Sequence, residues 1–330
     1  MEYRSIKGFT GLGQMGFLFA FVGFGAVLAG AVQAFFALQM LPAGAKITDT
    51  DVLLKAMFLP QNLGLVRASQ VLGSMLLMFV PAVMWSFVCH GKNVIWLGFS
   101  KHINVFQILL AFMIIFVAGI DVNPLSDFTK YVVAHLPSID VAAKKMEALY
   151  NKQATALSNI TSMQEYIVAL FIMAFFPAMF EEVFFRGTLQ NMLVRWSQKP
   201  MLSIILTSIL FSLVHSSIYL FLSRALLGFV LGLMFYKTKN IWVNIIAHFL
   251  NNTFVLTSLY IMQQKTGKVD LDKLEPSIHW SVGIAAMIVL IGLFSLLTKY
   301  SIKNRSYIVD DENALMEGKD RVNNFANHLN

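Results

Sequence analysis

The sequence predicts an all-α, polytopic membrane protein with about eight transmembrane helices. Of its 330 residues, 57% are hydrophobic and only 13% are charged, whereas soluble domains contain about 25% charged residues. Several uninterrupted apolar runs of about 20 residues are long enough to cross a hydrocarbon core of about 30 Å. The strands of a membrane β-barrel would instead show alternating apolar and polar residues, so we expect a helical bundle.

Hydrophobic runs set the position of each expected helix. The first run is too long for the apolar part of a signal peptide, so we interpret it as a first span. The fourth is long enough to project beyond the bilayer or to form two helices joined near Pro177 or Gly187, and the sixth is short. The expected spans are roughly 15–41, 69–90, 103–121, 164–195, 201–222, 224–237, 240–263 and 279–298.

Loop charges predict the orientation of these spans. Alternate connections are short and basic, whereas segments 42–68, 122–163 and 264–278 contain both acids and bases. The positive-inside rule therefore places both termini in the cytoplasm of a multi-pass protein of the cell (inner or plasma) membrane. The same loop lysines and arginines account for the net charge of +7, so we expect a lipid bilayer and no nucleic acid as partner. The basic residues that carry this argument are Arg4, Lys7, Lys92, Lys101, Arg195, Lys199, Lys237, Lys239, Lys299, Lys303 and Arg305.

Four regions follow from this pattern. We expect N-terminal transmembrane helices in 1–122, an extramembrane connector in 123–163, a functional core in 164–263, and a last transmembrane helix with a charged, mobile C-terminal tail in 264–330. The middle of the connector has the composition of an amphipathic surface helix, with Val141, Met146, Leu149 and Tyr150 able to share one face.

The fourth apolar run contains the motif EEVFFR, from Glu181 to Arg186. A charge at bilayer depth costs about 2.5–3.5 kcal/mol on insertion scales, so such a group needs a partner or a function. Glu182 and Arg186 are four residues apart and share a helix face, where they can neutralise each other. Glu181 is rotated by about 100° from that face and is left free for chemistry. We therefore expect Glu182 and Arg186 to support the structure, and Glu181 to be a general base.

Two further apolar runs each carry a histidine. His215 follows Phe211 by four residues in FSLVH, and Asn252 follows His248 by four residues in HFLNN. Asn supplies uncharged N–H donors, which can stabilise a developing oxyanion. Either histidine taken alone is also consistent with a simple hydrogen bond across a helix interface.

Together, Glu181, His215 and His248 can converge on one water molecule inside a helix bundle. The same two histidines and one carboxylate would suit zinc, so a metal-free site and a zinc site both remain open. At 1.5 Å per residue from the inner helix ends, Glu181 and His215 lie about 20 Å deep but His248 only about 12 Å. Tilted or offset helices are needed to bring them together.

These motifs resemble the three signatures of the CPBP intramembrane protease family. This is the group of type II CAAX prenyl endopeptidases and bacteriocin-processing proteins, also called the Abi family. Its pattern is a double Glu with Arg four residues after the second, then Phe with His four residues on, then His with Asn or Asp four residues on. The resemblance covers about residues 160–260, and it is carried by Glu181, Glu182, Arg186, Phe211, His215, His248 and Asn252.

The resemblance implies a catalytic helix bundle in the C-terminal half that hydrolyses a peptide bond within the membrane. Glu181 would activate water with help from His215, and His248 and Asn252 would form the oxyanion hole. The substrate would be a membrane peptide or a lipidated protein. Related eukaryotic proteins trim a tripeptide after a prenylated cysteine, whereas bacterial ones are linked to bacteriocin maturation or immunity. A non-catalytic immunity or scaffold protein is the main alternative, and a proton-coupled transporter is a third.

Overall fold

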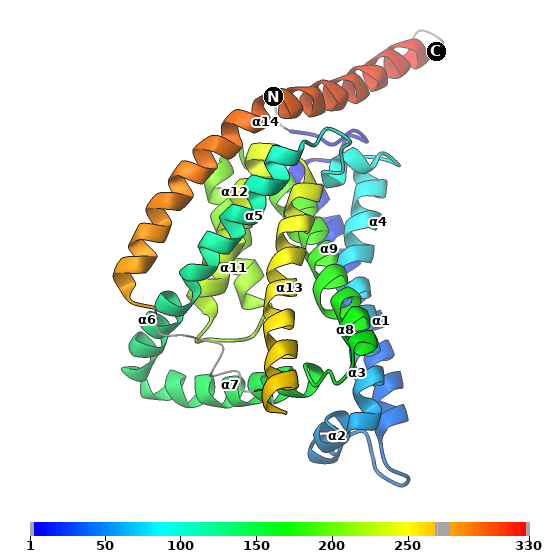
Figure 1. Ribbon diagram of the computed structural model, residues 1–330. Coiled ribbons are helices and arrows are strands. Elements are labelled where there is room, and N and C mark those ends of the chain that lie inside the picture. Colours follow the sequence, from blue (N-terminus) through cyan, green and yellow to red (C-terminus); the bar gives the residue numbers. More distant parts are fainter. Residues whose placement is uncertain (1–2, 268, 270–277, 328–330) are drawn as a thin grey trace.

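The computed structural model describes residues 3–267, 269 and 278–327, and it is an all-α bundle (Figure 1). Seven of its helices are long and apolar enough to cross a membrane. The predicted fold class is therefore confirmed, and the chain is a multi-pass membrane protein. These seven helices are Gly11–Met40, Pro60–Cys89, Val105–Ala134, Met163–Ser197, Phe221–Thr238, Ile241–Thr266 and Trp280–Glu317, the last being the apolar part of a longer helix.

The structure differs from the prediction at the expected span 201–222. Its helix, α11 (Pro200–Leu213), has only 14 residues, which is about 21 Å of helix. The chain turns after Leu213, with Ser216 at a positive φ of 52°. This turn is held by polar groups, since the Arg224 guanidinium donates to the carbonyl of His215 (3.0 Å). The prediction missed the turn because apolar residues flank its short polar stretch, 215–217, on both sides. The short sixth span is present as α12 (Phe221–Thr238).

The fourth span is one long helix with two π-helical segments. It consists of α8 (Met163–Ala169), a π segment (Leu170–Phe175), α9 (Phe176–Glu182), a second π segment (Val183–Gln190) and α10 (Asn191–Ser197). Pro177 therefore lies in the first turn of α9 without breaking the long helix. Single π turns inside α-helices are frequent at functional sites because they change the direction of the side chains that follow. Here they lie on both sides of the glutamate pair.

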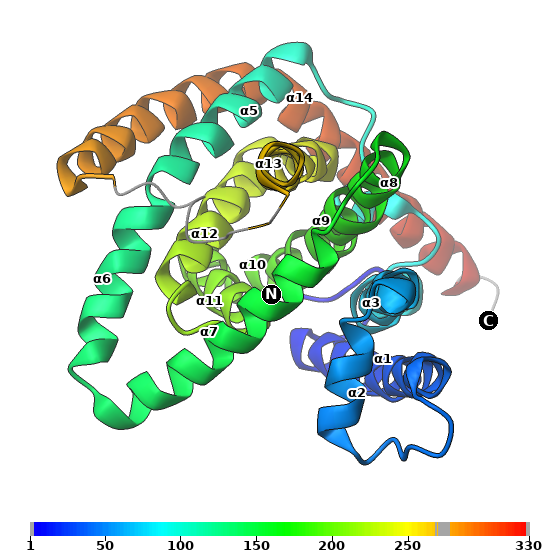
Figure 2. The same ribbon diagram turned by 60° about the horizontal axis from the view of Figure 1, so that its bottom comes forward.

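Helix α13 (Ile241–Thr266) stands inside the bundle, as the end-on view in Figure 2 shows. It packs against α5 (Val105–Ile120), α12 and the α8–α10 helix. A core of buried side chains joins α5, α12, α13 and α14 (Trp280–Asn327). A second core joins the α8–α10 helix and α11 to α1 (Gly11–Met40) and α4 (Val80–Cys89). The second core is made of Leu18, Trp85, Cys89, Phe185, Leu189, Met192 and Phe211.

The remaining elements of the N-terminal half connect or extend these spans. Three of them belong to the second span, Pro60–Cys89, and another helix continues α5 beyond Asp121 into the expected connector. The elements are α2 (Thr50–Met57), the 3-10 turn Pro60–Asn62, α3 (Leu63–Ser74), the π segment Met75–Phe79, the 3-10 turn Val94–Leu97 and α6 (Val122–Ala134).

Helix α7 (Pro137–Leu157) is the helix expected in the connector. Its packed face differs from the predicted one, because Val141 and Leu149 are exposed while Ala143 is buried. Tertiary contacts, rather than the apolar pattern, select that face.

The C-terminal segment also differs from the expected mobile tail. Helix α14 continues to Asn327 and turns across the end of the bundle at which both termini lie (Figure 1). Glu312 pairs there with Arg195 (2.7 Å) and Lys239 (2.6 Å). These ion pairs attach the C-terminal segment to the ends of α10 and α12.

Gly187 provides a test of this packing. A Cβ at this position would collide with the backbone carbonyl of Leu97, and overpacking of this kind typically costs about 1–3 kcal/mol. We expect Gly187→Ala to lower the melting temperature in detergent. Gly119→Ala is the matched control, because a Cβ there meets no atom within 4 Å. Equal melting temperatures for the two variants would contradict the close approach.

Candidate active site

Glu182 and Arg186 form an ion pair in the interior of the bundle. Arg186 Nη1 lies 2.7 Å from Glu182 Oε1, and the two side chains are 2% and 0% exposed. The i,i+4 spacing places them on one face, as expected from the sequence. An ion pair this deeply buried requires further hydrogen bonds to its remaining polar atoms.

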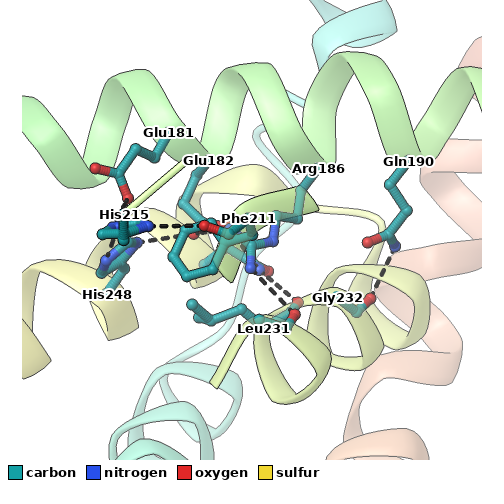
Figure 3. A network of polar contacts seen from close by, with 11 residues as sticks. Glu181, Glu182, Arg186, Gln190, Phe211, His215, Leu231, Gly232 and His248 are labelled. Atoms are coloured by element: carbon teal, nitrogen blue, oxygen red, sulfur yellow. Dashed lines mark hydrogen bonds and ion pairs between the residues drawn. The ribbon is translucent and has the colours of Figure 1, made fainter. Parts of the chain in front are cut away.

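Helix α13 supplies those hydrogen bonds (Figure 3). His248 Nδ1 lies 2.8 Å from Glu182 Oε1, and Asn244 Nδ2 donates to Glu182 Oε2 (3.1 Å) and to the carbonyl of Leu231 (2.7 Å). Asn244 was missed in the sequence analysis. The signal was present, because Asn244, His248 and Asn252 follow one another at four-residue spacing along a single helix face.

Arg186 also ties the glutamate helix to α11 and α12. Its Nη2 donates to the carbonyl of Gly228 (3.1 Å), and its guanidinium lies 4.5 Å from the ring centre of Phe211. One turn further, Gln190 Nε2 donates to the carbonyl of Gly232 (2.8 Å). Glu182, Arg186 and Gln190 thus form a row of polar side chains that joins this helix to α12 and α13 within an apolar bundle.

Glu181 is differently placed. Its side chain is 16% exposed, and its Oε2 atom is buried without any hydrogen-bond partner. The Nε2 atoms of His215 and His248 both lie 3.8 Å from that oxygen. The structure therefore brings these three predicted residues together, at a distance too long for direct hydrogen bonds.

The Nδ1 atoms of both histidines already have hydrogen-bond partners. His215 Nδ1 lies 2.7 Å from the carbonyl of Phe211, and His248 Nδ1 lies 2.8 Å from Glu182. Since a carbonyl and a carboxylate accept hydrogen bonds, each Nδ1 must carry the proton, and a neutral ring then has a lone pair on Nε2. Three hydrogen-bond acceptors consequently face one another, and a water molecule between them can donate to two of the three.

Asn252 does not join this group directly. Its Nδ2 atom makes a long contact of 3.4 Å with the carbonyl of Ala174, in the first π segment. The carboxamide lies one helical turn from His248, as expected. Among the described contacts, none joins it to Glu181 or to either histidine.

His215 lies in the turn after α11, and that turn is fastened to α7. Ser217 Oγ donates to Glu147 (3.0 Å) and Tyr219 Oη donates to Asp140 (2.8 Å). The guanidinium of Arg224 lies 5.0 Å from the ring centre of Tyr150 while it holds the carbonyl of His215. Helix α7 and Arg224 together fix the turn that carries one of the two imidazoles.

The zinc alternative can be tested against the geometry. Two imidazoles and a carboxylate are suitable zinc ligands, and their outer atoms are hydrogen-bonded as in many metal sites. However, within the described part of the chain no three His, Cys, Asp or Glu side chains are close enough together to hold a metal ion. As placed, Glu181 Oε2 lies 3.8 Å from each imidazole Nε2, which is about 0.4 Å longer than the separation of neighbouring ligands on a tetrahedral zinc ion. The three groups would therefore have to move closer together to bind zinc.

The fold and this buried polar cluster define a multi-pass membrane protein with an intramembrane site. Residues 163–254 match the model of the family described as type II CAAX prenyl endopeptidase Rce1-like. This part of the chain is thus an Rce1-like domain of the CPBP family, as the motifs indicated, and membership implies an intramembrane protease acting on a protein or peptide. Comparisons with curated proteins and with solved structures found no match.

The buried ion pair gives a first prediction for the site. Arg186→Ala leaves the Glu182 carboxylate without its cation, and breaking a buried pair in this way typically costs about 3–5 kcal/mol. We expect a clear loss of thermal stability in detergent. Lys144→Ala is the control, because Lys144 pairs with Asp140 from a side chain that is 69% exposed and such pairs contribute only about 0–1 kcal/mol. Similar melting temperatures for both variants would contradict the assignment.

The bond between Tyr219 and Asp140 gives a pH-dependent prediction. The hydrogen bonds from Lys144 and Tyr219 lower the pKa of Asp140, and burial followed by the Asp140 hydrogen bond raises the pKa of Tyr219 to about 12. The stabilisation from Asp140 is therefore lost as pH falls below its ordinary value of about 3.9, and that from Tyr219 as pH rises from about 10.

The difference in melting temperature between the wild type and Tyr219→Phe should therefore be largest at intermediate pH and shrink at both extremes. Tyr300→Phe is the control, because Tyr300 is 42% exposed. A difference that stays constant across the pH range would refute the role of this hydrogen bond.

Proposed function

We propose that this protein is an intramembrane endopeptidase that hydrolyses a peptide bond in a membrane-associated or lipidated substrate, with a water molecule activated by Glu181. The observation that carries the proposal is the unpartnered Oε2 of Glu181, which faces two imidazole Nε2 atoms at 3.8 Å each. A water molecule between these acceptors can donate to two of the three, whereas none of the described side chains donates to the Glu181 oxygen.

In the proposed reaction, Glu181 accepts one proton as the water oxygen attacks the peptide carbonyl carbon. The same proton is then delivered to the nitrogen of the leaving amine, so the carboxylate is restored and one water is consumed. His215 holds the water through its Nε2 lone pair. General-base catalysis of this kind contributes about 10²–10⁴ to the rate.

The oxyanion would be stabilised by Asn252 and His248. Asn252 can donate a further N–H hydrogen bond, because the long contact with the carbonyl of Ala174 uses only one of its two amide protons. His248 can donate from Nε2 only as an imidazolium, because its Nδ1 proton points to Glu182. Glu182 and Arg186 are the structural support of the site.

We propose the predicted regions as functional units. Residues 164–263 form the peptidase core, which is close to the matched segment, and 1–122 and 264–330 flank it. Both termini lie at the same end of the bundle (Figure 1), and the basic loops support a cytoplasmic location for that end. The connector 123–163 then lies on the opposite side, where α7 supports the His215 turn.

Two other functions remain as alternatives. A non-catalytic immunity or scaffold protein would keep the Glu182–Arg186 pair but would not need an unpartnered Glu181. A proton-coupled transporter would use Glu181 and the histidines as a relay, and such proteins usually show inverted repeats that this sequence lacks. The family match favours proteolysis over both.

The decisive experiment is cleavage of a quenched peptide library, with and without a lipidated cysteine, by the purified protein in nanodiscs. We expect Glu181→Gln to reduce cleavage by about 10²–10⁴-fold with an unchanged melting temperature. Glu165→Gln is the matched control, because Glu165 lies at the start of α8 and binds Thr161. Cleavage by Glu181→Gln at the wild-type rate would refute the mechanism.

A chelator arm of the same assay tests the metal. Wild-type activity that survives the chelator supports the metal-free mechanism. Activity that is lost and then restored by zinc would instead show that Glu181, His215 and His248 move together to bind zinc.

A further inference from the structure

A cavity lies on the lipid-facing side of the bundle, between α6, α11, α12 and α14. It has a volume of about 360 Å³, within the range of about 300–1,000 Å³ found for small-molecule sites. Its lining is almost entirely apolar and includes none of the residues of the candidate active site. Three of its lining side chains, Ile205, Ile209 and Met287, are 45%, 38% and 44% exposed on the outer surface, so the cavity opens sideways toward the bilayer.

One carboxylate lines this apolar cavity. Asp121 lies between α5 and α6, within the apolar span Val105–Ala134, and only 4% of it is exposed. Its Oδ2 atom has no hydrogen-bond partner, and among the described residues no lysine, arginine or histidine pairs with it. The other polar lining residue, Ser208, donates its hydroxyl to the carbonyl of Ile204 (2.7 Å) and is therefore already satisfied.

The position of Asp121 is supported by its neighbours. On α14, a Cβ at Gly283 would lie 2.9 Å from Asp121 Oδ1, so the absence of a side chain there makes room for the carboxylate. Ser223 on α12 donates to the backbone carbonyl of Val122 (2.6 Å) and holds the junction next to it. A buried acid without a partner is unfavourable in a membrane and, by default, marks a functional site.

The apolar walls of the cavity and its unpaired carboxylate together indicate the kind of ligand that it would bind. The apolar walls and the opening toward lipid fit an aliphatic chain, and the unpaired carboxylate fits a cationic hydrogen-bond donor at the end of that chain. A phospholipid head group would place a phosphate beside the carboxylate, where like charges repel.

We propose that this cavity binds a single-chain amphiphile with a primary ammonium head group, and that the ammonium pairs with Asp121. The proposal does not depend on the peptidase function, because the cavity and the active site share no residue.

Direct binding tests this proposal. Dodecylammonium, dodecanol and phosphatidylethanolamine are titrated into the purified protein in phosphatidylcholine nanodiscs, with native mass spectrometry and the melting temperature as readouts. We expect dodecylammonium to bind with a single saturable site and to raise the melting temperature. Asp121→Asn should weaken its binding by about tenfold or more, because a hydrogen bond to a charged group is lost.

Two variants control for folding and for surface charge. Asp127→Asn removes an exposed carboxylate of α6 and should bind dodecylammonium like the wild type. Ala225→Phe fills the cavity from α12 and should abolish the saturable site. Equal binding by Asp121→Asn and the wild type, equal affinity for dodecanol, or stronger binding of phosphatidylethanolamine would each overturn the proposal.

Discussion

The buried carboxylate of Glu182 is the constraint on which the rest of the site depends. An isolated charge in this position would be strongly unfavourable, and it is neutralised by Arg186 on its own helix and by His248 and Asn244 on α13. Arg186 extends the network to α12 through Gly228 and to α11 through the ring of Phe211. Four helices are thereby fixed relative to one another, because any displacement would leave a charge or a donor unpaired in an apolar interior.

This network also separates the roles of two adjacent glutamates. Successive residues of a helix point about 100° apart, so Glu182 faces the polar network while Glu181 faces the partly open side. His248 connects the two, since its Nδ1 contacts Glu182 and its Nε2 faces Glu181. The Glu182 carboxylate thus fixes which nitrogen of His248 faces Glu181. A protein that only needed stability would gain nothing from leaving the Glu181 oxygen without a partner.

The spacing of residues along the chain made the buried ion pair and most of the spanning helices predictable from the sequence. The Glu182–Arg186 pair follows from i,i+4 geometry, and the apolar runs located seven of the spanning helices. The short helix α11 was not predictable in the same way, because the turn after Leu213 is stabilised by Arg224 from the next helix. The orientation of Asn252 toward Ala174 and the partners of Asn244 depend on how helices pack. Contacts between distant segments leave no periodic signal in the sequence.

The relative depth of Glu181 and His248 in the bundle likewise depends on contacts between distant segments, which the sequence does not reveal. Counted from the helix ends, Glu181 and His248 were expected at different depths, yet they meet. The reason is that the helix ends are not level. The segment around Leu97 and Gly98 packs against Gly187 on one helix and accepts a hydrogen bond from Ile241 N (2.8 Å) on the other. Glu181 lies six residues from Gly187, and His248 lies seven residues from Ile241. At 1.5 Å per residue these separations are about 9 Å and about 10.5 Å. A backbone contact between distant parts of the chain therefore aligns the acid with the imidazole.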